Sequence, residues 1–338
     1  MPLVREPAVP DLVALPKAEL HLHLEGAIRP STAAELSERH GLPAPRTGSF
    51  TDLAEFVGAY EAARDLVGDL DDLRRVSREL VEDAAARGVV WSEVHLVPPT
   101  YAGRLGPDEA VLEAVLDGLG PAAGVILGVN RGLPMEAAER SLELAVRYAG
   151  AGVVGLGLAG DEAGYPATLF ADVFARARAA GLRALPHGGE AAGPESVRAC
   201  VEVLGATRVN HGVRAVEDPD LVELLAQRQV CLDVCPSSNI ALSVYPSAEE
   251  HPLPRLLAAG VPVSLASDCP LFVGVTVLDE YRLARERFGL RHDELARIAR
   301  TSLTFSSCPP DRRDAALLAL DAWPERDPPP APPPAGGC

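Results

Sequence analysis

Histidine and acidic residues recur at the ends of short apolar runs, where they could bind a metal ion or move protons. His21 and His23 stand two apart in such a run, so both side chains would point to the same side of a strand. The full set comprises His21, His23, His187, Glu190, His211 and Asp268. Taken singly, each could be an ordinary residue: a hydrogen-bonded core histidine, a carboxylate at a helix N-terminus or an aspartate in a turn. Together they indicate one site.

The residue types in this set suit a zinc ion and hydrolysis. Imidazole and carboxylate groups are ligands that zinc accepts. A catalytic zinc also lowers the pKa of its bound water toward about 7. Such a nucleophile needs a nearby acid or base, and Glu190 stands three residues after His187 in Pro186-His-Gly-Gly-Glu190.

The elements that must position these residues are predicted to form a (β/α)8 barrel of the TIM type, an α/β fold. Apolar runs alternate with amphipathic stretches, and the strand at 19–24 is separated from the next by room for extra helices around 51–86. The predicted strands are 19–24, 89–97, 124–130, 153–159, 183–187, 208–211, 230–234 and 261–267. In such a barrel, chemistry gathers at the C-terminal ends of the strands, where the polar residues fall. A doubly wound sheet is the alternative, but no Gly-x-Gly-x-x-Gly motif supports it.

Composition narrows the partners. The 338 residues carry 31 Lys and Arg against 48 Asp and Glu, a formal charge of −17. This balance argues against nucleic acid and against a polybasic membrane contact, and favours a small-molecule substrate. It does not predict an oligomeric state. None of the six cysteines forms a Cys-x-x-Cys pair, and no long apolar segment begins the chain, so we expect a cytoplasmic protein with reduced thiols.

The chain reads as one domain with a tail. No linker or repeat interrupts it, so residues 1–323 are predicted to form a single metal-dependent barrel. Residues 324–338 are rich in proline and are predicted to be disordered.

Six motifs in order resemble the adenosine deaminase family of the amidohydrolase superfamily, over residues 15 to about 305. They are Leu15-Pro-Lys-Ala-Glu-Leu-His-Leu-His-Leu-Glu-Gly26, Leu158-Ala-Gly-Asp-Glu162, Pro186-His-Gly-Gly-Glu190, Arg208-Val-Asn-His-Gly212, Cys235-Pro-Ser-Ser-Asn239 and Ser264-Leu-Ala-Ser-Asp268. The resemblance implies a (β/α)8 barrel with one zinc ion per chain. It also implies hydrolytic removal of an exocyclic amine from an adenine-type ring.

The resemblance also implies residue roles. The implied zinc ligands are His21, His23, His187 and Asp268. Glu190 would pass a proton to the ring nitrogen beside the attacked carbon, and His211 would orient the water. Asp268 would also accept a hydrogen bond from that water. The backbone N–H of Gly160 would contact the ring. Protonating the ring makes its carbon more electrophilic, which is why a carboxylic acid is needed there.

Two residues depart from the family pattern. Most purine deaminases of the family have Asp-Asp-Pro where this chain has Asp268-Cys269-Pro, and a thiol is a weak hydrogen-bonding partner. Cys269 is then an exposed thiol, a packing residue or a sign of a different substrate ring, and packing or an altered substrate contact is favoured over a role as zinc ligand. Glu25 stands where adenosine deaminases have Asp, which is closer to the adenine and aminodeoxyfutalosine deaminase branches. The sequence thus favours an adenine-like substrate over adenosine itself.

Other residues have two open interpretations. His95, at the end of the second predicted strand, either faces substrate or caps the barrel, and Asp161 either contacts substrate or caps the next helix. His40, His251 and His292 are predicted to be solvated. The competing functions are a zinc hydrolase acting on a non-adenine amino-heterocycle or on an amide or ester bond, and a catalytically weak binding protein.

Overall fold

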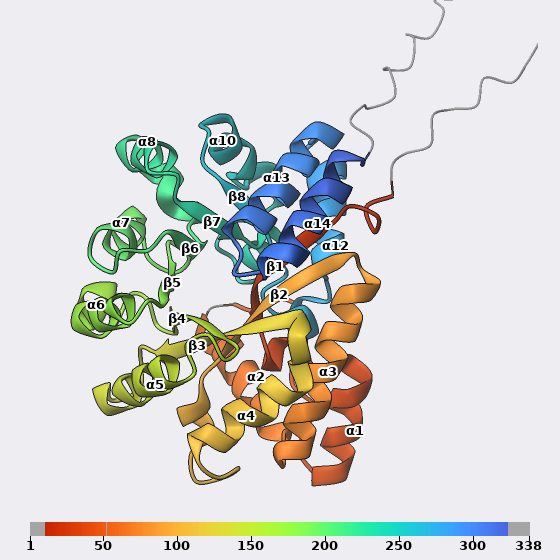
Figure 1. The fold of residues 1–338 in the computed structure, drawn as a ribbon, viewed down its shortest axis with the longest axis vertical. Helices are drawn as coiled ribbons and strands as arrows, with labels where there is room; N and C mark the ends of the chain where they lie inside the picture. Colours follow the sequence, from red (N-terminus) through yellow and green to blue (C-terminus); the bar gives the residue numbers. More distant parts are fainter. Residues whose placement is uncertain (1–10, 52, 324–338) are drawn as a thin grey trace, which may run out of the picture.

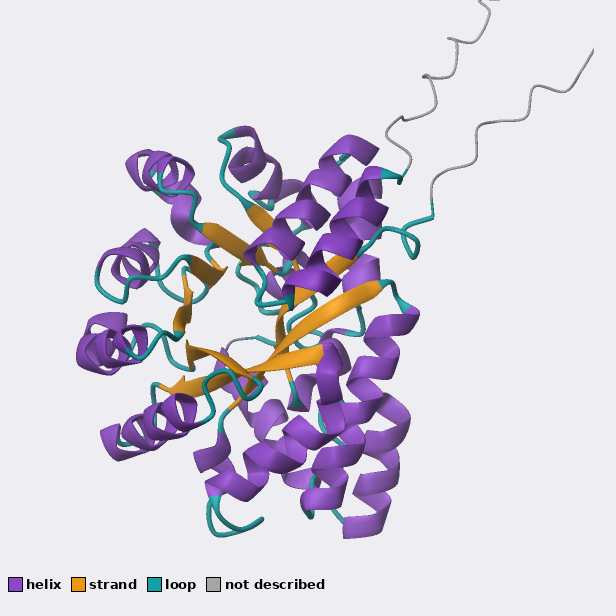
Figure 2. Cartoon of the chain, viewed as in Figure 1, coloured by secondary structure: helices purple, strands orange, loops and turns teal. Residues whose placement is uncertain are grey.

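Eight parallel strands make one barrel, and helices surround it (Figure 1; Figure 2). The computed structural model describes residues 11–51 and 53–323, so the predicted tail at 324–338 lies outside the described residues. The strands are β1 (Lys17–His23), β2 (Val89–Leu96), β3 (Ala123–Asn130), β4 (Val153–Ala159), β5 (Arg183–Gly188), β6 (Arg208–His211), β7 (Cys231–Val234) and β8 (Val263–Leu265). The sheet follows sequence order from β1 to β8, which confirms the predicted barrel.

The helices alternate with the strands, and three of them fill the gap after β1. The helices are α1 (Pro30–His40), α2 (Leu53–Leu66), α3 (Leu70–Ala86), α4 (Asp108–Leu119), α5 (Met135–Arg147), α6 (Ala171–Ala179), α7 (Pro194–Glu202), α8 (Pro219–Gln227), α9 (Pro236–Ala241), α10 (Leu253–Ala258), α11 (Pro270–Val273), α12 (Val277–Glu286), α13 (His292–Phe305) and α14 (Pro310–Asp321). Short 3₁₀ turns are η1 (Glu25–Ala27), η2 (Pro98–Tyr101), η3 (Gly120–Ala122), η4 (Ala167–Phe170), η5 (Val213–Glu217) and η6 (Ala248–Glu250). Among the described residues, no helix combines the length and apolarity needed to cross a bilayer.

The last strand is shorter than the sequence predicted. The apolar run at 261–267 predicts seven residues, whereas β8 spans only Val263–Leu265. Its partner strand β7 ends at Val234, which pairs with Leu265, so the ladder ends there. Three residues later Asp268 adopts φ 60°, a left-handed conformation that an extended strand does not contain. This turn directs the Asp268 side chain toward β1.

The barrel closes between its first and last strands at the residues expected to bind metal. His23 N–H donates to Asp268 O (2.9 Å), and Asp268 N–H donates to His21 O (3.2 Å). Leu22 and Asp268 form the corresponding isolated parallel bridge. The two ends of the sheet therefore meet beside the histidine side chains of β1.

A buried ionic network fills part of the barrel interior. The Arg208 guanidinium donates to Asp233 Oδ2 (2.6 Å), Glu93 Oε2 (2.7 Å) and the Leu20 carbonyl (3.0 Å). Ser264 Oγ also donates to Asp233 Oδ1 (2.6 Å). All three charged side chains are at most 1% exposed, so the single cation compensates two carboxylates that water does not reach.

We expect Arg208→Met to reduce the free energy of unfolding by about 3–5 kcal/mol, because it leaves two buried carboxylates without their cation. Urea denaturation of the metal-loaded protein measures this change. The control is Arg282→Met, which removes an exposed ion pair with Asp279 and should change stability by less than about 1 kcal/mol. A loss equal to that of the control would contradict the network's importance.

Candidate metal and catalytic site

Three imidazole nitrogens and one carboxylate oxygen converge at the C-terminal end of the barrel. His187 Nε2, from β5, lies 3.0 Å from His21 Nε2 and 3.1 Å from His23 Nε2, both from β1. Asp268 Oδ1, after β8, lies 3.5 Å from both β1 nitrogens. Three ring nitrogens that share one point with a carboxylate oxygen cannot all be paired by protons between them. The donor set therefore fits a shared cation such as zinc.

Burial keeps these rings in the form that binds metal. It lowers the pKa of His21 and His187 well below the usual histidine value, and lowers that of His23 as well. The neighbouring imidazoles add to the effect on His21 and His187. The rings are therefore neutral near pH 7, with a nitrogen lone pair available.

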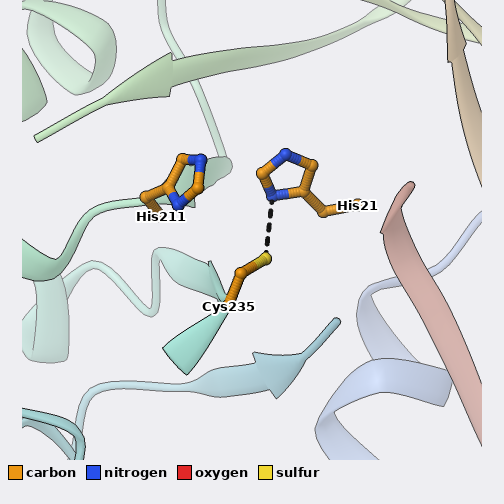
Figure 3. Close-up of side chains that lie close together, drawn as sticks. All are labelled: His21, His211 and Cys235. Atoms are coloured by element: carbon orange, nitrogen blue, oxygen red, sulfur yellow. Dashed lines mark hydrogen bonds between the residues drawn. The ribbon is translucent and has the colours of Figure 1, made fainter. Parts of the chain in front are cut away.

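The outer nitrogens of two of these rings also have partners. His21 Nδ1 lies 3.4 Å from the Asp233 carbonyl and 3.4 Å from Cys235 Sγ; Figure 3 shows the latter contact beside His211. Burial raises the pKa of the Cys235 thiol well above its usual value, which favours its neutral form beside His21. A ring whose Nδ1–H is held by a carbonyl presents Nε2 to a metal.

Asn210 occupies the matching position behind His187. Its amide nitrogen lies 3.3 Å from His187 Nδ1 and 2.7 Å from His95 Nε2, while its buried Oδ1 has no partner. The hydrogen-bond network decides which way an asparagine amide is turned. If the Asn210 amide is turned by 180°, its Oδ1 accepts from an N–H of His187 and an N–H of His95. His187 Nδ1 would then carry the proton and leave Nε2 free for a metal.

Glu190 and His211 lie beside this cluster. Burial, together with the charges of Asp268 and Glu162, raises the pKa of Glu190 well above the usual glutamate value, which favours a neutral carboxylic acid. His211 Nε2 is 3.4 Å from Glu190 Oε1. Asp268 Oδ2 accepts a hydrogen bond from Ser238 Oγ (2.6 Å), so Oδ1 is the oxygen that faces the histidines.

A chain of hydrogen bonds fixes the proton position on His211. The Leu253 N–H donates to His251 Nδ1 (3.2 Å), which leaves the proton of the neutral His251 ring on Nε2, 3.2 Å from Asn239 Oδ1. Asn239 Nδ2 then donates to His211 Nδ1 (3.1 Å). Since burial lowers the pKa of His211, its ring is neutral, with its proton on the Nε2 that faces Glu190.

The expectation that His251 and His292 are solvated is wrong, because each is only 3% exposed. His251 packs against the rings of Tyr245 and Phe288, and His292 meets Trp323 edge to face. His251 lies between η6 and α10, and His292 begins α13; both side chains face the interior, which the local sequence pattern does not reveal. His40 is exposed, as predicted.

Glu25 is buried in η1 and bonded by two tyrosines that the sequence did not single out. The Tyr101 hydroxyl donates to Glu25 Oε1 (2.6 Å), and the Tyr60 hydroxyl donates to Glu25 Oε2. Burial and the Glu25 charge raise the pKa of both phenols well above the usual value. Both carboxylate oxygens of Glu25 are therefore already engaged.

Cys269 fills a tight space at the edge of the site. Its side chain is 1% exposed, and its thiol lies 3.4 Å from Asp268 Oδ1. A Cβ atom on Gly26 would lie only 2.5 Å from Cys269 Sγ, so glycine at this position makes room for the thiol. Burial and the Asp268 charge raise the pKa of Cys269 well above its usual value, which keeps the thiol neutral.

The remaining predicted substrate residues, His95, Gly160 and Asp161, differ in how they lie relative to the histidine cluster. His95 stacks on His23 with ring centroids 4.8 Å apart, and its buried Nδ1 has no partner. Gly160 adopts φ 98° just after β4, a conformation suited to glycine. Asp161 is exposed and accepts from the Gly164 N–H (2.9 Å), so it caps its own turn. His95 lies within the histidine cluster, whereas Asp161 does not.

A cavity of about 340 Å³ opens beside Glu190. Its walls include Ala191, Arg214, Glu217 and residues 242–244. Both ends of the Glu217 carboxylate bond the Arg214 guanidinium (2.7 and 3.1 Å), which neutralises the charge at this rim. The volume suits a small molecule.

Comparisons with known proteins agree with this geometry. The family model described as adenosine deaminase matches residues 16–323. A Streptomyces coelicolor protein, provisionally described as an adenosine/adenine deaminase, is 41% identical over 93% of this chain and 98% of its own. The crystal structure of an adenine deaminase from Arthrobacter aurescens is 30% identical, with a TM-score of 0.82 over 93% of this chain and 99% of that one. A zinc-bound amidohydrolase structure from Burkholderia ambifaria is 27% identical, with a TM-score of 0.81 over 92% of this chain and 91% of that one. The chain therefore belongs to the adenosine deaminase family of hydrolytic deaminases.

Proposed function

We propose that this protein hydrolyses the exocyclic amine of an adenine-type base or nucleoside, giving a ring carbonyl and ammonia. The observation that carries the proposal is the position of the Glu190 carboxyl, 3.4 Å from His211 Nε2 and beside the convergent histidine cluster. Relatives described as adenosine or adenine deaminases support it. We further propose a cytoplasmic location, in keeping with the five described cysteines, all of them buried free thiols.

We propose that one zinc ion per chain is held by His21, His23, His187 and Asp268. The neutral buried imidazoles and the zinc-bound Burkholderia neighbour support this assignment. When bound, zinc would activate a water molecule for attack at neutral pH.

The protein residues would then act on the water and the ring. Glu190 would donate its proton to the ring nitrogen beside the attacked carbon. His211 Nε2–H would donate a hydrogen bond to the attacking oxygen and orient it, and Asp268 Oδ1 would accept one of the protons of that water. A carbon–oxygen bond forms and the carbon–nitrogen bond breaks. The proton given by Glu190 stays on the ring nitrogen. Of the two protons of the attacking water, the one taken up by Asp268 would pass to the amine, which leaves as ammonia, and the other would restore the Glu190 carboxylic acid.

Substrate contacts are proposed for Gly160, Glu25, Cys269, His95 and Asp161. Tyr60 and Tyr101 each bond one oxygen of the Glu25 carboxylate, which fixes its orientation and leaves fewer acceptor lone pairs for a sugar hydroxyl. This supports a free adenine-type base as the better substrate. The exposed position of Asp161 makes it the weakest of the five.

The test is ammonia release by purified, zinc-loaded protein. The panel would hold adenine, adenosine, deoxyadenosine, methylthioadenosine, aminodeoxyfutalosine, AMP, guanine and pterins. Activity on adenine-type compounds, with adenine above adenosine, is expected. No activity on any adenine compound at full zinc occupancy would reject the proposal.

Cys269 favours one second candidate, a zinc hydrolase that acts on a non-adenine amino-heterocycle or on an amide or ester bond.

The role of position 269 can be tested directly. If this residue contacts the purine, Cys269→Asp should raise kcat/KM for adenine or adenosine by about tenfold, the equivalent of one added hydrogen bond of about 1.4 kcal/mol. Steady-state assays of both variants on both substrates measure this. Unchanged kcat/KM on every substrate would mean that residue 269 does not contact the ring.

A further inference from the structure

The loop that carries Glu190 is held by a carboxylate from a neighbouring loop. Glu162, three residues after β4, accepts hydrogen bonds from four consecutive backbone N–H groups, those of residues 189 to 192. The distances are 2.5, 3.1, 2.8 and 3.0 Å in chain order. Gly189 has φ 70°, a left-handed conformation of the kind that lets successive amides turn toward one anion.

The buried side chain of Arg131 holds the backbone just before this segment, at His187. Arg131, just after β3, donates from Nη2 to the His187 carbonyl (2.7 Å) and from Nη1 to the Tyr165 carbonyl (2.8 Å). Arg131 is 1% exposed and Glu162 4% exposed. The backbone between His187 and residue 192 is thus fixed by a guanidinium at a carbonyl and by a carboxylate at the amides.

Both residues use a buried charge to bind backbone groups of another segment. The partners of Glu162 lie 27 to 30 residues later in the chain, so it does not cap the turn that follows it. Burying a carboxylate and a guanidinium is costly unless each is fully hydrogen-bonded. The four hydrogen bonds of Glu162 and the Nη2 bond of Arg131 all go to one backbone segment, which begins at His187 and includes Glu190.

We propose that Glu162 and Arg131 are positioning residues, which together fix the Glu190 carboxyl and the His187 ring in one geometry. Neither side chain is bonded to either of those groups; both act through the backbone. The negative charge of Glu162 also favours the protonated form of Glu190, in line with its raised pKa. The catalytic consequence rests on the function proposed above, whereas the structural part does not.

The experiment compares Glu162→Gln with a matched control, Glu195→Gln. The glutamine amide would direct N–H groups at the same backbone donors, so it cannot replace the carboxylate. Glu195 is exposed in the first turn of α7 and accepts from the Gly193 N–H (3.2 Å), just beyond the amides that Glu162 binds. For each variant we would measure zinc content, kcat, KM and hydrogen–deuterium exchange in the peptide that covers residues 189–192.

For Glu162→Gln we expect unchanged zinc content, with kcat about 10- to 100-fold lower and a smaller change in KM, as for a displaced catalytic group. Exchange at amides 189–192 should be at least about tenfold faster, from the loss of hydrogen bonds to a charged group. Glu195→Gln should match the wild type in both respects. Arg131→Lys should accelerate exchange in the same peptide, because a lysine cannot donate to both carbonyls in the same geometry.

The two readouts separate the possible failures. If no substrate is found, the exchange experiment still tests the loop contact, so failure of the proposed function remains distinguishable. If Glu162→Gln does not fold, Glu162→Asp replaces it, since the shorter carboxylate keeps the charge and loses reach. Wild-type exchange at 189–192 in the folded variant, or acceleration spread equally over the whole barrel, would overturn the proposal.

Discussion

Replacing Glu190 with glutamine should lower kcat by about 10²–10⁴-fold and leave metal binding intact, because the amide keeps the shape but cannot give up a proton as an acid does. Glu190 Oε1 lies 3.4 Å from His211 Nε2, and the Glu190 side chain is 13% exposed. Glu190 is not one of the four residues proposed as metal ligands. Stopped-time ammonia assays and metal analysis measure the two quantities separately. The exposed Glu223→Gln variant on α8 is the control, and it should retain wild-type kcat.

The pH dependence gives the same residue a second signature. Burial raises the pKa of Glu190 well above its usual value, and the reaction needs the protonated form. The rate should therefore be high at a pH below that raised pKa, where Glu190 is protonated, and should fall as the pH rises through it. The falling limb should be missing from the residual activity of Glu190→Gln. A variant with near-wild-type kcat, or with the same falling limb, would remove Glu190 from its proposed role.

Removing the metal should abolish turnover, with a loss of about 10³-fold or more, since metal stabilisation of the transition state is worth several kcal/mol. The protein would be treated with a chelator, dialysed and titrated with zinc while ammonia release and bound metal are followed. Activity should return in proportion to zinc and saturate near one equivalent per chain. His187→Ala should not recover, because it removes the nitrogen closest to both β1 histidines.

A barrel that keeps full activity with no bound metal would contradict this expectation. Saturation near two equivalents would contradict the single site. The exposed His40→Ala variant is the matched histidine control, because its ring contacts Asp72 on α3 and should leave zinc recovery unchanged. The comparison separates loss of a metal ligand from loss of a histidine in general.

The sequence predicted the barrel well because its signals are local. Continuous Val and Leu runs identify strands that are buried on both faces, and the predicted limits of 153–159 and 208–211 match β4 and β6. The eighth strand was predicted too long because hydrophobicity does not report where its partner strand β7 ends, at Val234 opposite Leu265. Residues at strand ends could also be predicted to meet, since all parallel strands end at one rim.

The partners of those residues could not be predicted from one sequence. Tyr60 lies on α2 and Tyr101 on η2, 35 and 76 residues from the Glu25 that they both contact. No periodicity links such positions; only the packing of α2 and η2 over the rim does. The Glu162 contact was missed for a related reason, because its acceptor role depends on the left-handed turn at Gly189 in another loop.

The closure between β1 and β8 has a consequence for how the protein is made. The hydrogen bonds that join Asp268 to His21 and His23 connect the first strand of the sheet with the segment that follows the last. Contacts of such long sequence separation form late, because the intervening chain must be ordered first. During synthesis, β1 leaves the ribosome long before its partner strand exists and must wait with one edge unpaired. No nascent chain that ends before Asp268 can contain the complete histidine–aspartate cluster, so a growing chain acquires it only when the sheet has joined end to end.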